Sequence, residues 1–331
     1  IRNVYRSEEH FGGARLGQKM SALEAALTRL GYSVVETRNV VDEAEAPPIY
    51  ENVQLNSKMM KSFLIHGTQF LSAGEKSIAI DWRQTWSGVL AMVYGKSLVV
   101  AECISKMDEL MPEFNFMKGE AFSVSGKFLK RSDVPTFEDI FLEPDNEKAL
   151  RRVKELVDSK GAEFTNRGMM LMGEPGTGKT LSGRMLMNQT KTTFIWVAAR
   201  DFYRMGAFGG ITYALDMARE CAPSIVFMED VDNWLDGTAV DLLKTELDGI
   251  SRSKGVLTIL TSNEPERMPD ALIDRPGRFH DVCHFGLPSA DVRKRMLDRW
   301  LKGINDKTAL KAIQETEGYS GAHVYELAFL A

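Results

Sequence analysis

The segment that most constrains this chain is residues 173–180, which read Gly-Glu-Pro-Gly-Thr-Gly-Lys-Thr. Its glycines let the backbone curl, so that successive N–H groups point into one concavity where a polyphosphate supplies the matching negative charge. An apolar run at residues 169–172 precedes the loop, and residues 179–188 have helical composition. We therefore expect a phosphate-binding loop between a buried parallel strand and a helix, with its amides at the positive helix end.

Two side chains of this loop carry specific chemistry. Lys179 can reach the β and γ phosphates of a nucleotide, and the Thr180 hydroxyl can ligate Mg²⁺. A glycine-rich surface turn is the alternative, but every signature position of the loop is filled and both flanks fit. The predicted nucleotide-binding residues of the loop are Gly173, Glu174, Pro175, Gly176, Thr177, Gly178, Lys179, Thr180 and Leu181.

A second apolar strand, residues 225–228, ends in Glu229 and Asp230. Carboxylates at this place would hold the water shell of Mg²⁺ and orient the attacking water for in-line displacement at the γ phosphate. Acids at a strand end can also be simple solvated caps. Their position downstream of a phosphate loop favours the metal interpretation.

Two further segments indicate a family. Residues 255–263 read as a buried strand with a polar amide, Asn263, at its tip, and residues 270–279 read Asp-Ala-Leu-Ile-Asp-Arg-Pro-Gly-Arg-Phe. Together they resemble the second region of homology of the AAA ATPases. The resemblance runs from about Val134 to the end of the chain and includes Thr-Glu-Leu-Asp-Gly at 245–249 and Gly-Tyr-Ser-Gly-Ala at 318–322. It is specific, because the motifs occur in the family's order and spacing.

The resemblance implies a role for each matching residue. Asn263 corresponds to the first sensor, an amide that hydrogen-bonds the γ phosphate or the attacking water. Arg275 and Arg278 correspond to arginine fingers, whose planar guanidinium groups serve the nucleotide bound by the neighbouring subunit. Two arginines in a solvated turn are the alternative. Fingers that act between subunits imply a closed ring, which in this family is usually a homo-hexamer that uses ATP and Mg²⁺.

The acid pair departs from the family pattern. Most relatives carry Asp-Glu where this chain carries Glu229-Asp230, so the two carboxylates differ by one methylene in opposite directions. The exchanged pair, with the Arg-Gly lead at 167–168, is similar to the mitochondrial translocase of the Rieske iron–sulfur protein and related bacterial ATPases. We assign the Mg²⁺ shell to Glu229, through water, and the polarisation of the attacking water to Asp230. The rate of turnover stays open.

The resemblance extends to the lid and to a pore loop. Gly321 and Ala322 correspond to the small-residue form of the second sensor, which lets a lid helix approach the nucleotide. The backbone near Ile140 is expected to meet the adenine base, although Phe141 and Leu142 stand where relatives usually have a small residue and glycine. Phe208 is the candidate pore-loop aromatic, and packing into a local core is its alternative.

We expect three parts in this chain, in an α/β fold. Residues 131–288 would form a nucleotide-binding domain with a parallel sheet and helices on both faces, and residues 289–331 a small helical lid. Residues 1–130 would form a separate N-terminal α+β domain of unknown family that selects the substrate or partner. There, a helix before Gly31, strands at 32–37, 77–82 and 97–101, an exposed connection at 43–48 and a hairpin over 114–124 are expected.

The composition of the chain disfavours several classes of function. The net charge is −5 and no basic run is present, which disfavours nucleic acid as the main substrate. The three cysteines form no Cys-x-x-Cys pair, which suits the cytoplasm or another reducing compartment. Residues 88–104 are the most apolar stretch and read as helix, turn and strand rather than a membrane span. Because the chain begins with Ile1, an upstream anchor or targeting signal remains open.

These features predict a ring-forming, Mg²⁺-dependent ATPase that remodels, unfolds or translocates a protein client. No His-Glu-x-x-His sequence is present, so the chain itself is not a zinc protease of the membrane-bound AAA type. A nucleotide-gated scaffold that assembles with ATP and hydrolyses it slowly is the alternative, and the exchanged Glu229-Asp230 pair supports it.

Overall fold

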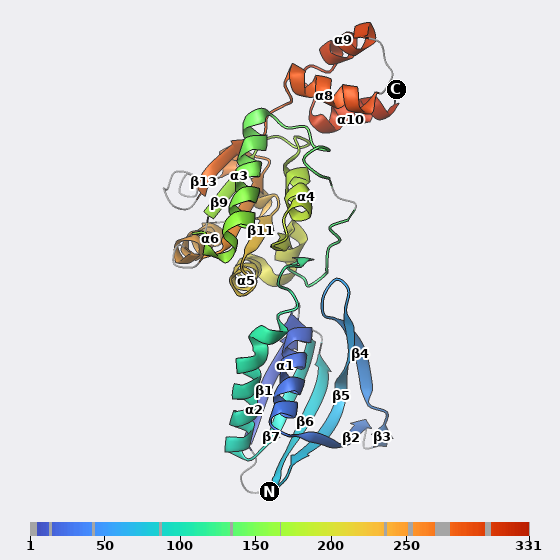
Figure 1. The fold of residues 1–331 in the computed structure, drawn as a ribbon, viewed down its shortest axis with the longest axis vertical. Coiled ribbons are helices and arrows are strands. Elements are labelled where there is room, and N and C mark those ends of the chain that lie inside the picture. Colours follow the sequence, from blue (N-terminus) through green and yellow to red (C-terminus); the bar gives the residue numbers. More distant parts are fainter. Residues whose placement is uncertain are drawn as a thin grey trace. The chain divides into compact units, whose positions relative to one another are not determined.

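The computed structural model describes residues 5–12, 15–41, 44–85, 88–132, 135–165, 167–234, 237–250, 254–268, 279–301 and 306–330. The chain divides into two compact units (Figure 1). The first unit is Ile1–Met117 with Ser125–Phe128, and the second is Lys118–Val124 with Leu129–Ala331. Among the described residues, no helix combines the length and the apolar character needed to span a bilayer.

The first unit is a seven-stranded antiparallel sheet with two helices packed against one face (Figure 1). The strand order is β1-β7-β6-β5-β2-β3, and β4 pairs with β5. The strands are β1 (Tyr5–Gly12), β2 (Ser33–Val41), β3 (Ala44–Ala46), β4 (Ile49–Gln54), β5 (Met60–Ala73), β6 (Lys76–Thr85) and β7 (Gly88–Gly95). The helices are α1 (Leu16–Arg29), α2 (Ser97–Leu110) and the short 3-10 helix η2 (Met111–Phe114).

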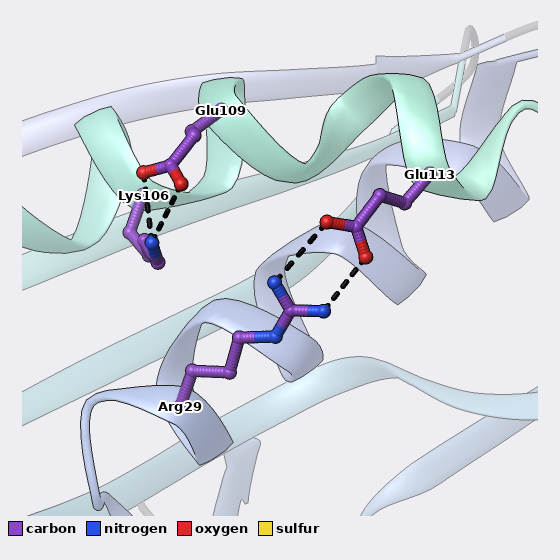
Figure 2. Close-up of polar contacts among 4 residues, drawn as sticks. All are labelled: Arg29, Lys106, Glu109 and Glu113. Atoms are coloured by element: carbon purple, nitrogen blue, oxygen red, sulfur yellow. Dashed lines mark hydrogen bonds and ion pairs between the residues drawn. The ribbon is translucent and has the colours of Figure 1, made fainter.

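The core of this unit lies between the sheet and the helices. Alternate residues of β6, Ile78, Ile80 and Trp82, are buried on one face, as the period of two requires for a half-covered strand. The Trp82 indole N–H donates to the side-chain oxygen of Gln69 at 3.0 Å, so this tryptophan belongs to the core. On the surface, Arg29 of α1 forms a bidentate ion pair with Glu113 of η2. The Lys106–Glu109 ion pair of α2 lies beside it (Figure 2).

The expected helix before Gly31 and the strands at 32–37 and 77–82 are confirmed as α1, β2 and β6. The expected strand at 97–101 is wrong, because α2 begins at Ser97. Val99, Cys103 and Met107 recur every fourth residue and bury one helical face. The order within 88–104 is therefore strand, turn and helix, the reverse of the expectation.

Of two other expectations for this region, the exposed connection is confirmed in its exposure but contains an unexpected short strand, and the hairpin is wrong. The connection at 43–48 contains β3, whose short ladder with β2 closes a hairpin. No hairpin forms over 114–124, because Phe114 ends η2 and the next strand pairs elsewhere. That strand, β8 (Ala121–Ser123), lies parallel to β10 in the sheet of the second unit. Its three residues are all buried there.

The second unit is an α/β layer with a helical lid. Its six strands are parallel, in the order β13-β9-β12-β11-β10-β8. All residues of β11 and β12 are buried, as expected for strands that helices cover on both faces. Besides β8, the strands are β9 (Arg167–Met172), β10 (Thr193–Val197), β11 (Ser224–Met228), β12 (Val256–Ser262) and β13 (Phe279–His284).

Helices α3 and α4 pack on each other, and α5 packs on α6, β10 and β11. The lid helices are α8, α9 and α10, and α8 packs on both of the others. Among the described residues, the helices of the unit are α3 (Pro144–Lys160), α4 (Lys179–Gln189), α5 (Ala199–Glu220), α6 (Gly237–Ile250), α8 (Ala290–Trp300), α9 (Asp306–Glu315) and α10 (Gly321–Leu330), with 3-10 turns η3 (Gly161–Glu163), η4 (Val231–Asn233) and η5 (Pro265–Arg267). Because the strands are parallel, the carboxyl ends of β9, β11 and β12 meet at one edge of the sheet.

Candidate active site

The loop at 173–178 joins β9 to α4, as the sequence predicts. Its first glycine is required by space, because a Cβ at Gly173 would lie 2.0 Å from the main-chain oxygen of Phe285. Gly176 and Gly178 are required by conformation, since their φ angles are +77° and +103°. The Gly173 N–H donates to Ser262 O of β12 at 3.1 Å and ties the loop to the neighbouring strand end.

Lys179 lies at the start of α4 with only 5% of its surface exposed. Its ammonium group donates to the carbonyl oxygens of Gly173 at 2.6 Å and Glu174 at 2.8 Å. Burial lowers the pKa of Lys179, and the nearby Asp230, Asp232 and Glu174 carboxylates partly offset this. Both acceptors are neutral oxygens, so a bound phosphate would supply the strong anionic partner that this buried charge favours.

A cavity of about 710 Å³ opens beside the loop, a size that suits a nucleotide. It brings together residues from the loop, the strand ends, the segment before α3 and the lid. The predicted site residues that line it are Pro175, Gly176, Thr177, Gly178, Lys179, Thr180, Leu181, Ile140, Asp230, Asn263, Gly321 and Ala322. The other lining residues are Asp139, Phe141, Arg184, Met296, Trp300 and Tyr325.

Asp230 and Asn263 stand at the ends of adjacent strands and bond to each other. The Asn263 amide donates to the Asp230 carboxylate at 2.9 Å, and the Asn263 backbone N–H donates to Asp232 at 3.0 Å. The Asp230 backbone N–H donates to the Thr261 hydroxyl at 2.9 Å. These bonds fix a carboxylate and an amide side by side on the cavity wall.

Glu229 lies elsewhere. Its carboxylate accepts a hydrogen bond from the Trp196 indole N–H at 2.8 Å, and the Trp234 indole N–H donates to its main-chain oxygen at 3.1 Å. It lines a second cavity of about 560 Å³, whose wall also includes Trp196. Asp230 and Arg184 line both cavities. The exchanged acid pair is therefore divided, with one carboxylate on the nucleotide cavity and the other beside it.

The lid reaches the loop through small residues. The Ala322 N–H donates to Gly176 O at 3.2 Å. A Cβ on Gly321 would lie 3.2 Å from the methyl carbon of Met296 and 3.4 Å from Gly176 O, so a larger residue would crowd this contact. The lid therefore contacts the phosphate loop at these two positions, and their role toward a nucleotide stays a prediction.

The aromatic wall of the cavity is the part that sequence reasoning missed. The Trp300 ring lies edge-on to Phe141 at 5.4 Å and to Tyr325 at 5.0 Å. Phe141 departs from the family pattern, and its contact with Trp300 of the lid explains how the bulk is accommodated. This departure is the one available signal, because an aromatic at the end of a lid helix is indistinguishable in sequence from ordinary core.

The predicted residues that remain are the loop residues Gly173 and Glu174, the acid Glu229, and three residues whose roles stay predictions. Arg275 and Arg278 fall outside the described residues, and their finger role stays a prediction. Phe208 lies in α5, in a helix that continues on both sides of Gly206, whose φ of 71° and ψ of 151° are non-helical. The pore-loop role of Phe208 also stays a prediction. Across the described part of the chain, no group of three or more His, Cys, Asp or Glu residues could hold a metal ion.

Comparisons with known proteins bear on this site. Residues 169–287 match the family described as "ATPase family associated with various cellular activities (AAA)". The ATP-dependent zinc metalloprotease FtsH of Haemophilus influenzae is 27% identical over 313 residues, which cover 85% of this chain and 46% of that protein. A protein of Methanocaldococcus jannaschii named as a 26S proteasome regulatory subunit homolog is 27% identical over 281 residues, which cover 72% of this chain and 74% of that protein.

Among solved structures, the crystal structure of the FIGL-1 AAA domain in complex with ADP matches with 24% identity and a TM-score of 0.49, over 60% of this chain and 75% of that one. The chain spans less than half the length of the FtsH relatives that it matches. The matched segment contains the phosphate loop, the acid pair and Asn263. The second unit of this chain therefore contains a domain of the AAA ATPase family.

Proposed function

We propose that this chain is a ring-forming, Mg²⁺-dependent ATPase that couples ATP hydrolysis to the remodelling, unfolding or translocation of a protein client. The observation that carries the proposal is one cavity lined by the phosphate loop, the buried Lys179 and the bonded pair of Asp230 and Asn263. Sequence similarity to an ATP-dependent protease and to a proteasome regulatory subunit homolog supports work on proteins.

The residues present fit ATP and Mg²⁺. The loop leads into the start of α4, and the positive φ angles of its glycines allow the tight curl in which backbone N–H groups bind polyphosphate. Thr180 and Asp230 line the cavity, and a hydroxyl and a carboxylate are oxygen donors of the kind that Mg²⁺ prefers. When bound, Mg²⁺ would neutralise charge on the phosphates. Glu229 would join its water shell only by leaving Trp196.

Hydrolysis needs a group that polarises water, and Asp230 is the candidate. Its carboxylate lines the cavity and is held by the Asn263 amide, which would itself hydrogen-bond the γ phosphate or the attacking water. A neutral amide at position 230 keeps the size of the side chain but removes its basicity. We expect Asp230→Asn to bind ATP with normal affinity and to release phosphate on the order of 10²-fold more slowly.

This assignment is tested by measuring phosphate release and nucleotide binding for the wild type, Asp230→Asn and Glu229→Gln. If Asp230→Asn hydrolyses ATP steadily while Glu229→Gln does not, the water-polarising role belongs to Glu229. A pull-down with Asp230→Asn held in ATP would also trap the client and identify its class.

The ring is proposed from the family resemblance of Arg275 and Arg278. Arg278→Ala should retain nucleotide binding and lose turnover, since an arginine finger contributes about 10³ to 10⁵ in rate. Mixing it with the loop variant Lys179→Ala should restore partial activity, because a mixed ring contains interfaces where an intact loop faces an intact finger. Wild-type turnover by Arg278→Ala alone would remove the main support for the ring.

A nucleotide-gated scaffold is the second candidate. The division of the acid pair favours it, because a Glu229 carboxylate bonded to Trp196 is withdrawn from the nucleotide cavity. Negligible phosphate release by the wild type, with client present, together with assembly that depends on ATP in analytical ultracentrifugation would support the scaffold.

We also propose that the first unit selects the client or partner. The net charge of −5 disfavours nucleic acid as the main substrate. A reducing compartment such as the cytoplasm is proposed from three free cysteines that are all buried. Localisation of the tagged protein in cells tests this part.

A further inference from the structure

Glu229 and Asp230 are adjacent in sequence, yet of the two only Asp230 lines the nucleotide cavity. Asp230 lines both cavities, whereas Glu229 lines the second cavity alone, whose wall also includes Trp196 of β10. In the described chain, the hydrogen-bond donor on the Glu229 carboxylate is the indole N–H of Trp196, at 2.8 Å. The direction of Glu229 is thus set by a side chain on the neighbouring strand.

Trp196 is well placed to hold this carboxylate. Its strand β10 pairs with β11 in the register Trp196↔Phe227, so its ring stands next to the strand that carries Glu229. The indole packs on the buried rings of Phe227 at 4.7 Å and Phe194 at 5.9 Å. A donor whose ring is fixed by packing loses little freedom when it bonds, and a hydrogen bond to a carboxylate is stronger than one between neutral groups.

We propose that Trp196 is a positioning residue that holds Glu229 out of the nucleotide cavity and competes with the bound metal for its carboxylate. The inference rests on the proposed function. While Glu229 is bonded to Trp196, Asp230 is the carboxylate of the pair that faces the phosphates. When Glu229 is released, a second carboxylate becomes available to the phosphate site, where it would repel metal-free nucleotide and assist metal-bound nucleotide.

The test measures the dissociation constant of a fluorescent ATP analogue in EDTA and in Mg²⁺, for the full chain. Trp196→Phe keeps a packed ring and removes the N–H donor. We expect it to weaken binding in EDTA and to tighten binding in Mg²⁺. The dissociation constant in EDTA divided by the dissociation constant in Mg²⁺ should therefore rise about tenfold or more, as expected for one charge-assisted hydrogen bond.

The chain offers a matched control in Trp234→Phe. This substitution removes an indole N–H that bonds to the same residue, but to its main-chain oxygen at 3.1 Å rather than to its carboxylate. It should leave the ratio unchanged. In a Glu229→Gln background, where the charge is absent, Trp196→Phe should also leave the ratio unchanged.

A second readout does not depend on a folded Trp196→Phe variant. The five tryptophans can be labelled with 5-fluorotryptophan and each ¹⁹F resonance assigned by single substitution, or by elimination for Trp196. The Trp196 resonance should shift in Glu229→Ala and on addition of ATP with Mg²⁺, and should not shift with ATP in EDTA.

Equal changes of both dissociation constants in Trp196→Phe would overturn the inference, as would the same rise of their ratio in Trp234→Phe. It would also be overturned if the ratio still rises when Trp196→Phe is made in the Glu229→Gln background, or if the Trp196 resonance does not respond to Glu229→Ala. A wild type that binds and hydrolyses ATP while Trp196→Phe leaves the ratio unchanged overturns this inference alone. A wild type that binds no ATP overturns the proposed function and this inference with it.

Discussion

Asp230 has a left-handed backbone conformation, with a φ of 48° and a ψ of 52°. Few residues other than glycine adopt this region, and Asp and Asn tolerate it best because their short polar side chains can bond locally. A longer Glu has no such advantage. The torsion angle therefore gives a physical reason for a short acid at position 230.

The first prediction concerns Lys179. Replacement by Met keeps the aliphatic stem and removes a charge whose burial is unfavourable, as its lowered pKa indicates. Lys179→Met should lose ATP affinity on the order of 100-fold while its unfolding temperature stays close to that of the wild type. Calorimetric titration and thermal unfolding measure the two quantities. Wild-type affinity in this variant would show that the phosphate site is assigned wrongly.

At the scale of single residues, the sequence predicts the role of a residue when that role depends on the local backbone. The loop glycines and Lys179 act through a strand, a turn and a helix that are contiguous in the chain, so their pattern suffices. The bond between Trp196 and Glu229 depends on which strands are neighbours and on side-chain directions, and no local pattern encodes it. The roles of Arg275 and Arg278 stay predictions.

At the scale of the elements, the segment just after β13 is held against the phosphate loop by a hydrogen bond and a close backbone contact. Phe285, just after β13, donates its N–H to Met172 O at 2.7 Å, and its carbonyl oxygen lies against Gly173. There is no room between them for a side chain, and Gly173 also has a φ of +150°. The loop therefore depends on an element that is far away in sequence.

The second prediction tests this contact. Gly173→Ala should destabilise the second unit by about 3 kcal/mol, through the clash and the strained φ. The matched control is Gly286→Ala, where a Cβ would meet no atom within 4 Å. Urea unfolding measures both variants. Equal stability of Gly173→Ala and Gly286→Ala would mean that the loop and β13 separate readily.

Helix α2 of the first unit shows where a local pattern misleads. Short apolar runs rich in valine suit a strand, and residues 98–101 read Leu-Val-Val-Ala. The helical period becomes visible only when the window extends to Leu110, the last residue of α2. The parallel strands of the second unit are apolar runs bounded by turn residues and helical segments, so their type is predictable from the sequence.

At the scale of the whole molecule, each unit has a buried thiol in its core. Burial raises the pKa of Cys103 in the first unit and of Cys283 in the second to about 11. In the unfolded chain each thiol ionises at about pH 8.5. A raised folded pKa means that this contribution to stability is complete below the unfolded value and is lost as the pH rises toward the folded value.

The third prediction follows from these thiols. Between about pH 8 and pH 10 the free energy of unfolding should fall by on the order of 1 kcal/mol more per thiol in the wild type than in Cys103→Ala or Cys283→Ala. The alanine variants are less stable at the lower pH because a cavity remains, but their pH dependence is shallower. Denaturant titrations at the two pH values give the slopes. Identical slopes would show that the thiols ionise equally in both states.

The short strand β8 has a further consequence. It covers one edge of the sheet: Phe194 donates its N–H to Glu120 O at 2.9 Å, and Val124 donates to Trp196 O at 3.0 Å. A chain shortened to begin at residue 131 would expose these groups on an apolar strand, and an open edge of this kind pairs with other chains. Light scattering should show faster aggregation than for a chain that begins at residue 118. We therefore expect the segment 118–130 to protect this edge of the sheet against pairing with other chains.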